Sequence, residues 1–116
     1  MTQISRPMPR PTAQVKPYVD AFGPDLAVEF LLAFGGAPLA IPAHPKGRSR
    51  LEALVGPDRV RALAGQSHLL QSRVPLAKRW LAAYLAWQGH SVSEIARRLR
   101  VTDTSVRKWL NEGRLV

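Results

Sequence analysis

The sequence predicts a small, mainly all-α protein that ends in a helix-turn-helix. Apolar residues recur at helical spacing through much of the chain, and Pro-Asp pairs and glycines mark where several helices would begin and end. Residues 91–113, SVSEIARRLRVTDTSVRKWLNEG, divide into two short helical repeats separated by a break. At 116 residues, the chain has room for one domain, or for one small domain with a compact attachment.

The chain is also strongly basic. It contains 17 Lys and Arg residues against 8 acidic ones, which gives a net charge of +9 and an isoelectric point near 11.3. Such a surface attracts polyanions, either nucleic acid or an anionic membrane. There is no cysteine, which excludes disulfides and thiolate metal sites, and no apolar run is long enough to span a bilayer. We therefore expect a soluble protein of the bacterial cytoplasm or nucleoid, with no membrane partner.

Residues 1–19 are predicted to form a flexible, basic, proline-rich arm. Each of the four prolines removes a backbone donor and disfavours helix in the residue before it. Arg6, Arg10 and Lys16 lie among these prolines. Two interpretations stay open: the arm is a solvated tail, or it reaches the DNA backbone or minor groove, as homeodomain arms do.

Residues 20–72 are predicted to form an N-terminal helical region that serves in dimerisation or partner binding. A first helix should begin at Pro24, because proline suits the first helical position, and end at Gly35-Gly36. Its apolar residues at helical spacing are Leu26, Phe30, Leu31 and Phe34. Residues 37–42, APLAIP, are too short for a helix, so we expect a short extended segment or an edge β-strand there.

Two short helices are predicted in the second half of this region. Ser49 and Glu52 have capping-box spacing before LEALV, and this helix should stop at Gly56. The next should begin at Pro57 and stop at Gly65. The role of residues 43–72 as a whole stays unassigned.

Residues 73–116 are predicted to form the DNA-binding domain. They hold nine Lys and Arg residues against three acidic ones, so most of the positive charge of the chain lies here. A helix should begin at Pro75 and end at Gly89. Its predicted apolar stripe consists of Leu76, Trp80, Ala83, Tyr84 and Trp87.

The spacing of small and apolar residues after Gly89 is typical of a helix-turn-helix. Ser91 or Ser93 should cap the first helix, and Thr102 or Asp103 the second. Arg100 stands at the turn position where many such motifs have glycine, so the turn has to accommodate a side chain. The predicted core of the motif consists of Ile95, Ala96, Leu99, Val101, Val106 and Trp109.

The second helix, residues 103–112, is predicted to enter the major groove of double-stranded DNA. Arginine can bond guanine bidentately, and asparagine can bond adenine in the same way. The predicted base contacts are Thr104, Ser105, Arg107, Lys108 and Asn111. The predicted phosphate contacts are Arg97, Arg98, Arg100 and Thr102, which lie on the first helix, on the turn or at the start of the second helix.

The C-terminal 40 residues resemble a bacterial or phage helix-turn-helix domain, and the segment EFLLAFGGAPLAIP followed by such a domain partially resembles the Mor/C transcription activators of Mu-like phages. The residues that carry this second resemblance are Phe34, Gly35, Gly36, Ile41 and Pro42, with Ala96, Val106 and Trp109. The resemblance implies a homodimer that binds two half-sites about 10–10.5 bp apart. It also implies that RNA polymerase or another protein is a partner. Gly35-Gly36 would then either stop a helix or begin a strand that pairs across the dimer.

The function that these patterns favour is that of a sequence-specific transcriptional regulator from a phage or mobile element. Whether it activates or represses stays open, because the sign depends on where its site lies relative to a promoter. The alternative is a nucleoprotein adaptor of packaging or transposition type, which binds DNA through the same motif and recruits a partner. A helix pair that only docks proteins is a further alternative. The three histidines are dispersed and no phosphate loop or nucleophile elbow occurs, so we expect no enzyme activity, metal or cofactor.

Overall fold

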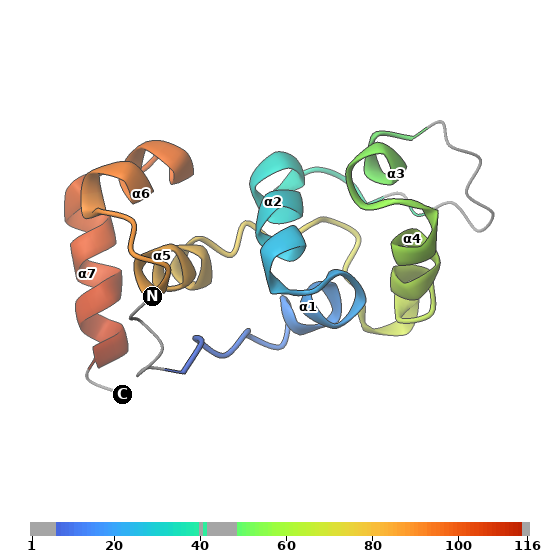
Figure 1. Cartoon of the computed structure of the whole chain (residues 1–116), viewed down its shortest axis with the longest axis horizontal. Helices are drawn as coiled ribbons and strands as arrows, with labels where there is room; N and C mark the ends of the chain where they lie inside the picture. The colour runs from blue at the N-terminus through green and yellow to red at the C-terminus, as the bar shows by residue number, and fades with distance from the viewer. Residues whose placement is uncertain (1–6, 40, 42–48, 115–116) are drawn as a thin grey trace. The chain divides into compact units, whose positions relative to one another are not determined.

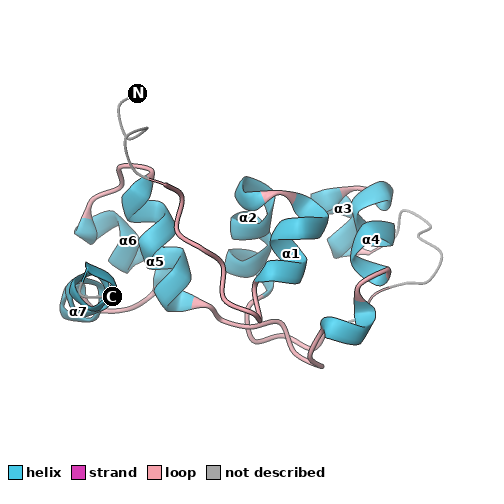
Figure 2. Cartoon of the chain, turned by 90° about the horizontal axis from the view of Figure 1, so that it is seen from below, coloured by secondary structure: helices cyan, strands magenta, loops and turns pink. Residues whose placement is uncertain are grey.

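The computed structural model of the chain describes residues 7–39, 41 and 49–114, and within these it is all-α, as predicted. Figures 1 and 2 show the helices without any strand in the described residues. The helices are α1 (Lys16–Phe22), α2 (Pro24–Phe34), α3 (Arg50–Val55), α4 (Pro57–Ala64), the 3-10 helix η2 (Ser67–Leu69), α5 (Lys78–Trp87), α6 (Val92–Leu99) and α7 (Asp103–Arg114).

The chain divides into two compact units. One is formed by Pro11–Leu76 and contains α1 to α4; we call it the four-helix unit. The other joins Met1–Arg10 to Ala77–Val116 and contains α5 to α7; we call it the helix-turn-helix unit. The second unit is therefore discontinuous in sequence, because its N-terminal segment is separated from its helices by the whole of the first unit.

The core of the four-helix unit is built around aromatic rings. Within this unit α1 packs on both α2 and α4. The rings of Tyr18 and Phe30 stack with their centroids 5.2 Å apart, and Phe22 meets Phe30 edge-on at 5.3 Å. Such pairs stabilise a core beyond the area that they bury. Val15, Val60 and Leu63 are among the other side chains buried in this core.

Helix α1 replaces the end of the predicted arm. The sequence prediction placed residues 1–19 in an extended arm, but residues 16–19 belong to α1 and Val15 is buried. Pro17 stands in the first turn of α1, where its missing N–H has no intrahelical partner to lose. Of the residues before α1, 1–6 lie outside the described part of the chain.

The predicted ends of α2, α3 and α4 are confirmed. Helix α2 begins at Pro24 and ends before Gly35. Helix α3 is capped by Ser49, whose hydroxyl accepts a hydrogen bond from the Glu52 N–H at 3.0 Å. Gly56 then separates α3 from α4. Its φ of 88° is a backbone conformation that residues other than glycine rarely adopt.

Of the two structures predicted for residues 37–42, the described part forms the short extended segment and not the edge strand; it has a single antiparallel bridge, between Pro38 and Arg73. Gly36 N–H donates to Val74 O at 2.8 Å, and Val74 N–H donates to Ala37 O at 2.9 Å. Pro38 has no N–H to extend such a ladder. The backbone after the double glycine is thus paired within its own chain, while residues 40 and 42 lie outside the described part.

Helix α5 begins three residues later than predicted, at Lys78 instead of Pro75. Hydrogen bonds to residues 37 and 39 hold residues 72–74 extended, and Ala77 then adopts a left-handed conformation with φ 54°. Leu76 was therefore wrongly placed on the apolar stripe, and 54% of it is exposed. The buried residues of α5 are Trp80, Leu81, Ala82, Tyr84 and Leu85, whereas Ala83 and Trp87 are only partly buried.

Candidate nucleic-acid interface

Helices α6 and α7 form the predicted helix-turn-helix, and α5 packs against both of them. Figure 1 shows α7 along its length, and Figure 2 shows it nearly end-on while α5 runs in the plane of the view, so α5 and α7 cross steeply. This crossing supports the back of α7 and leaves the opposite face of the helix for a ligand.

The start of α6 is fixed by a complete capping box. The Ser91 hydroxyl accepts a hydrogen bond from the Glu94 N–H at 3.1 Å, and the Ser91 N–H donates to the Glu94 carboxylate at 3.1 Å. Chiefly because of this backbone hydrogen bond, and also because His90 lies nearby, the pKa of the Glu94 carboxyl is lowered. Of the two predicted caps, Ser91 is therefore the one used, and it sets the orientation of α6.

The turn between the two helices accommodates Arg100 in the left-handed conformation, with φ 60° and ψ 47°. Val101 N–H donates to Ala96 O at 3.0 Å, the bond that closes a helix end of the Schellman type. Glycine is common at this position because it has no Cβ to strain the left-handed backbone. The arginine is thus tolerated at some cost, and its side chain is exposed beside the motif.

Replacing Arg100 with glycine is expected to raise the free energy of unfolding by up to about 1 kcal/mol, because the left-handed strain is relieved. If Arg100 also contacts phosphate, the same variant should bind DNA more weakly despite its greater stability. The matched control is Arg97→Gly, which places the same residue inside α6 and should destabilise by about 1 kcal/mol. Thermal unfolding of both variants measures these changes in stability, which should have opposite signs. A less stable Arg100→Gly variant would contradict the idea that the left-handed backbone at Arg100 is strained.

The six predicted core positions of the motif differ in burial. Ile95, Ala96, Leu99 and Val106 are buried, and Ile95 and Val106 have no exposed surface. Val101 and Trp109 are only half-buried. The seam between α6 and α7 is thus closed by the four buried side chains, while Trp109 lies at its edge.

Four of the predicted base-contacting residues lie on one exposed face of α7. Thr104, Arg107, Lys108 and Asn111 recur at helical spacing and are all exposed, roughly opposite the buried Val106. Arg107 lies 3.8 Å from the Asp103 carboxylate one turn earlier, a pair that is open to solvent. Exposed pairs of this kind are weak, so the guanidinium can exchange this carboxylate for a ligand.

Ser105 and Thr102 are placed differently from these four. The Thr102 hydroxyl accepts a hydrogen bond from the Ser105 N–H at 3.1 Å and also donates to the Ser105 hydroxyl at 3.1 Å. Thr102 therefore caps α7, which resolves the choice between Thr102 and Asp103. Ser105 is half-buried on the side of the helix away from Arg107. The contacts predicted for Thr102 and Ser105 stay predictions; while the Ser105 hydroxyl accepts from Thr102, it can still donate its own proton.

The predicted phosphate-binding arginines form a second exposed group. Arg97 and Arg98 lie in the last turn of α6, where a positive charge also interacts favourably with the negative end of the helix dipole. Arg100 follows directly in the turn. All three are exposed, so they offer positive charge next to the N-terminus of α7.

Two supporting contacts of this unit were not predicted from the sequence. Trp80 is only 4% exposed, and its Nε1–H donates to Pro9 O at 3.2 Å, which ties the segment before α1 to α5. The Arg79 guanidinium lies 3.4 Å from the Glu112 carboxylate and joins α5 to α7. The apolar stripe identified Trp80 as a core residue. However, Pro9 is far from Trp80 in sequence and Glu112 is far from Arg79, so no local pattern indicates these contacts.

Comparison with known proteins supports the helix-turn-helix assignment. Residues 73–113, less than half of the chain, match the family model of the homeodomain-like domain, a DNA-binding helix-turn-helix type. No curated protein and no solved structure matches the chain. The comparisons give no link to the Mor/C activators or to phage proteins. Among the described residues, no helix is both long and apolar enough to cross a membrane.

Proposed function

We propose that this chain is a sequence-specific DNA-binding protein that regulates transcription by placing α7 in the major groove, and that it is not an enzyme. The observation that carries the proposal is the exposed face of α7, where Thr104, Arg107, Lys108 and Asn111 lie opposite the buried seam of the motif. Arginine and asparagine on such a helix have the geometry to read guanine and adenine.

The charge of the surrounding surface supports the same function. Arg97, Arg98 and Arg100 are exposed at the end of α6 and in the turn, where the backbone of a bound duplex would pass. Phosphate contacts of this kind supply most of the affinity and fix the orientation, while base contacts specify the sequence. The match to a homeodomain-like domain over residues 73–113 is consistent with this division of roles.

The finer parts of the proposal follow from the resemblance to the Mor/C activators. They are a homodimer that binds two half-sites, dimerisation or partner binding through residues 20–72, a second partner such as RNA polymerase, and a phage or mobile-element origin. A cytoplasmic or nucleoid location belongs with them. Since one small reading helix binds few base pairs, a dimer would also provide the affinity that a single copy lacks.

Selection of bound sequences from a random pool of duplex DNA tests the proposal directly, with sedimentation of the protein to count its subunits. A palindromic enriched site and a dimer would support the regulator. Strong, salt-sensitive binding without enrichment would instead favour the nucleoprotein adaptor. If the full chain does not bind duplex DNA at low salt, the DNA-binding function is wrong and the helix pair docks proteins.

Replacing Arg97 with alanine should weaken binding to the selected site and to random duplex by the same factor. One lost phosphate contact should also reduce the slope of log affinity against log salt by about one. Arg61→Ala is the matched control, because it removes the same charge from an exposed site on α4. Fluorescence anisotropy at several salt concentrations measures both slopes; equal slopes for Arg97→Ala and Arg61→Ala would exclude Arg97 from the interface.

A further inference from the structure

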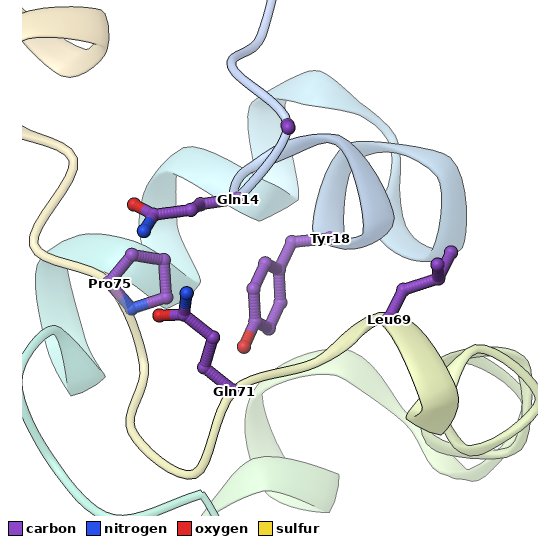
Figure 3. A pocket seen from close by; sticks show the side chains of 6 residues that line it. Gln14, Tyr18, Leu69, Gln71 and Pro75 are labelled. Carbon is purple, nitrogen blue, oxygen red and sulfur yellow. The ribbon is translucent and has the colours of Figure 1, made fainter.

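The four-helix unit contains a small open pocket that the DNA-binding function does not use. It has a volume of about 170 Å³ and is lined by Ala13, Gln14, Tyr18, Leu69, Gln71 and Pro75. Figure 3 shows Tyr18 between Leu69 on one side and Gln14, Gln71 and Pro75 on the other. These residues come from the segment before α1, from α1 itself and from η2 and the segment that follows it.

Tyr18 gives this pocket its chemistry. Its side chain is 1% exposed, and its hydroxyl is buried without a hydrogen-bond partner in the described part of the chain. In Figure 3 this hydroxyl points toward Gln71, among the side chains that line the pocket. Leaving a buried polar group unpaired costs free energy, so such groups usually have a partner. A ligand with a hydrogen-bond acceptor would supply one.

The other lining residues restrict the kind of ligand. Burial raises the pKa of the Tyr18 phenol, so it stays protonated at neutral pH and can donate a hydrogen bond to a ligand. Among the described residues, the lining contains no Lys, Arg, Asp, Glu or His, and these residues therefore offer no countercharge to an ion. Gln14 and Gln71 are exposed, so their amides can turn to admit a ligand and then both donate to it and accept from it.

We propose that this pocket binds a neutral single-ring molecule that carries an amide or lactam group. The ring would pack against the apolar part of the lining, the carbonyl would accept from Tyr18, and the amide N–H would bond a glutamine carbonyl. The size agrees, because an apolar cavity of about 150 Å³ accommodates one benzene ring. Such a site would make the four-helix unit a ligand-binding unit.

Titration of the isotopically labelled full chain with benzamide, followed by NMR, tests this proposal without DNA. The side-chain amide signals of Gln14 and Gln71 are expected to shift, with weak affinity because the probe is small. Benzoate, which has the same ring and a negative charge, should bind at least about tenfold more weakly, since the pocket would have to desolvate its charge. If benzamide shifts neither signal up to its solubility limit, or benzoate binds equally well, the proposal is overturned.

Tyr18→Phe removes only the hydroxyl. It is expected to weaken benzamide binding by about three- to tenfold, the value of one hydrogen bond. The melting temperature should stay the same or rise, because the hydroxyl has no partner to lose. Tyr84→Phe, which removes the same group from the helix-turn-helix unit, should leave binding unchanged.

Gln71→Ala provides an independent variant at an exposed position, so its effect does not depend on the core of the unit. It is also expected to weaken benzamide binding severalfold. Unchanged affinity in both Tyr18→Phe and Gln71→Ala would show that benzamide binds elsewhere and would exclude this pocket. Duplex binding by the same variants should be retained, which separates the fate of this proposal from that of the DNA-binding function.

Discussion

Ile95→Ala is expected to lower the free energy of unfolding of the helix-turn-helix unit by about 2–5 kcal/mol. Ile95 has no exposed surface and lies on α6, which packs against both α5 and α7. The truncation removes apolar contacts and leaves a cavity in the core of the unit, which α6 cannot close without shifting against its neighbours. Since a small domain has about 5–15 kcal/mol in total, this loss is a large fraction of the stability of the fold that presents Arg107.

Denaturant unfolding of the full chain, followed by tryptophan fluorescence, measures this loss. DNA affinity should fall with it at temperatures where the unit is partly unfolded, and recover on cooling. The control is Ile95→Val, which keeps most of the volume and should cost only about 0.5–1.5 kcal/mol. An Ile95→Ala protein as stable as the parent would mean that Ile95 does not lie at a tight seam.

Arg107→Ala is expected to weaken binding to the selected site by about 1–3 kcal/mol, or about five- to 150-fold. The guanidinium is exposed on the outer face of α7, where it lies 3.8 Å from the Asp103 carboxylate, and that pair is open to solvent. Stability should hardly change, because an exposed pair of this kind contributes little. Binding to random duplex should fall much less than binding to the selected site.

Arg107→Lys is the sharper control, because it keeps the charge but loses the planar fork that bonds a guanine edge. If Arg107 reads a base, Arg107→Lys should bind random duplex as the parent does and yet lose preference at one position of the site. Selection from a random pool with both variants identifies that position. If Arg107→Ala loses the same affinity for the selected site and for random duplex, Arg107 contacts phosphate and does not read a base.

The helix-turn-helix could be predicted closely because its determinants are local. Each helix start offered two predicted caps close together in sequence, and the structure uses one of each pair, Ser91 for α6 and Thr102 for α7. The buried positions of the motif recur at helical spacing. At position 100, where many such motifs have glycine, this chain has arginine. The left-handed geometry of the turn is kept, but with more strain than glycine would have.

The errors had two causes, one local and one due to distant segments. Helix α1 was missed for a local reason: the prolines of residues 1–19 were interpreted as helix breakers, although Pro17 lies in the first turn and Val15, Tyr18 and Phe22 have helical spacing. The start of α5 was placed too early because residues 72–74 are held extended by hydrogen bonds to a segment more than thirty residues earlier. The Tyr18 pocket combines residues 13–18 with residues 69–75, two parts of the chain that are far apart in sequence, so no local pattern could indicate it.

The division of the chain into a continuous and a discontinuous unit bears on how the protein folds as it leaves the ribosome. Residues 11–76 emerge together and can fold as soon as they are free, whereas residues 7–10 wait for α5, which is made after the four-helix unit. Until α5 emerges, the carbonyl of Pro9 cannot accept its hydrogen bond from the Trp80 indole. During synthesis, the part of the chain that would hold DNA therefore becomes competent only after the four-helix unit has emerged.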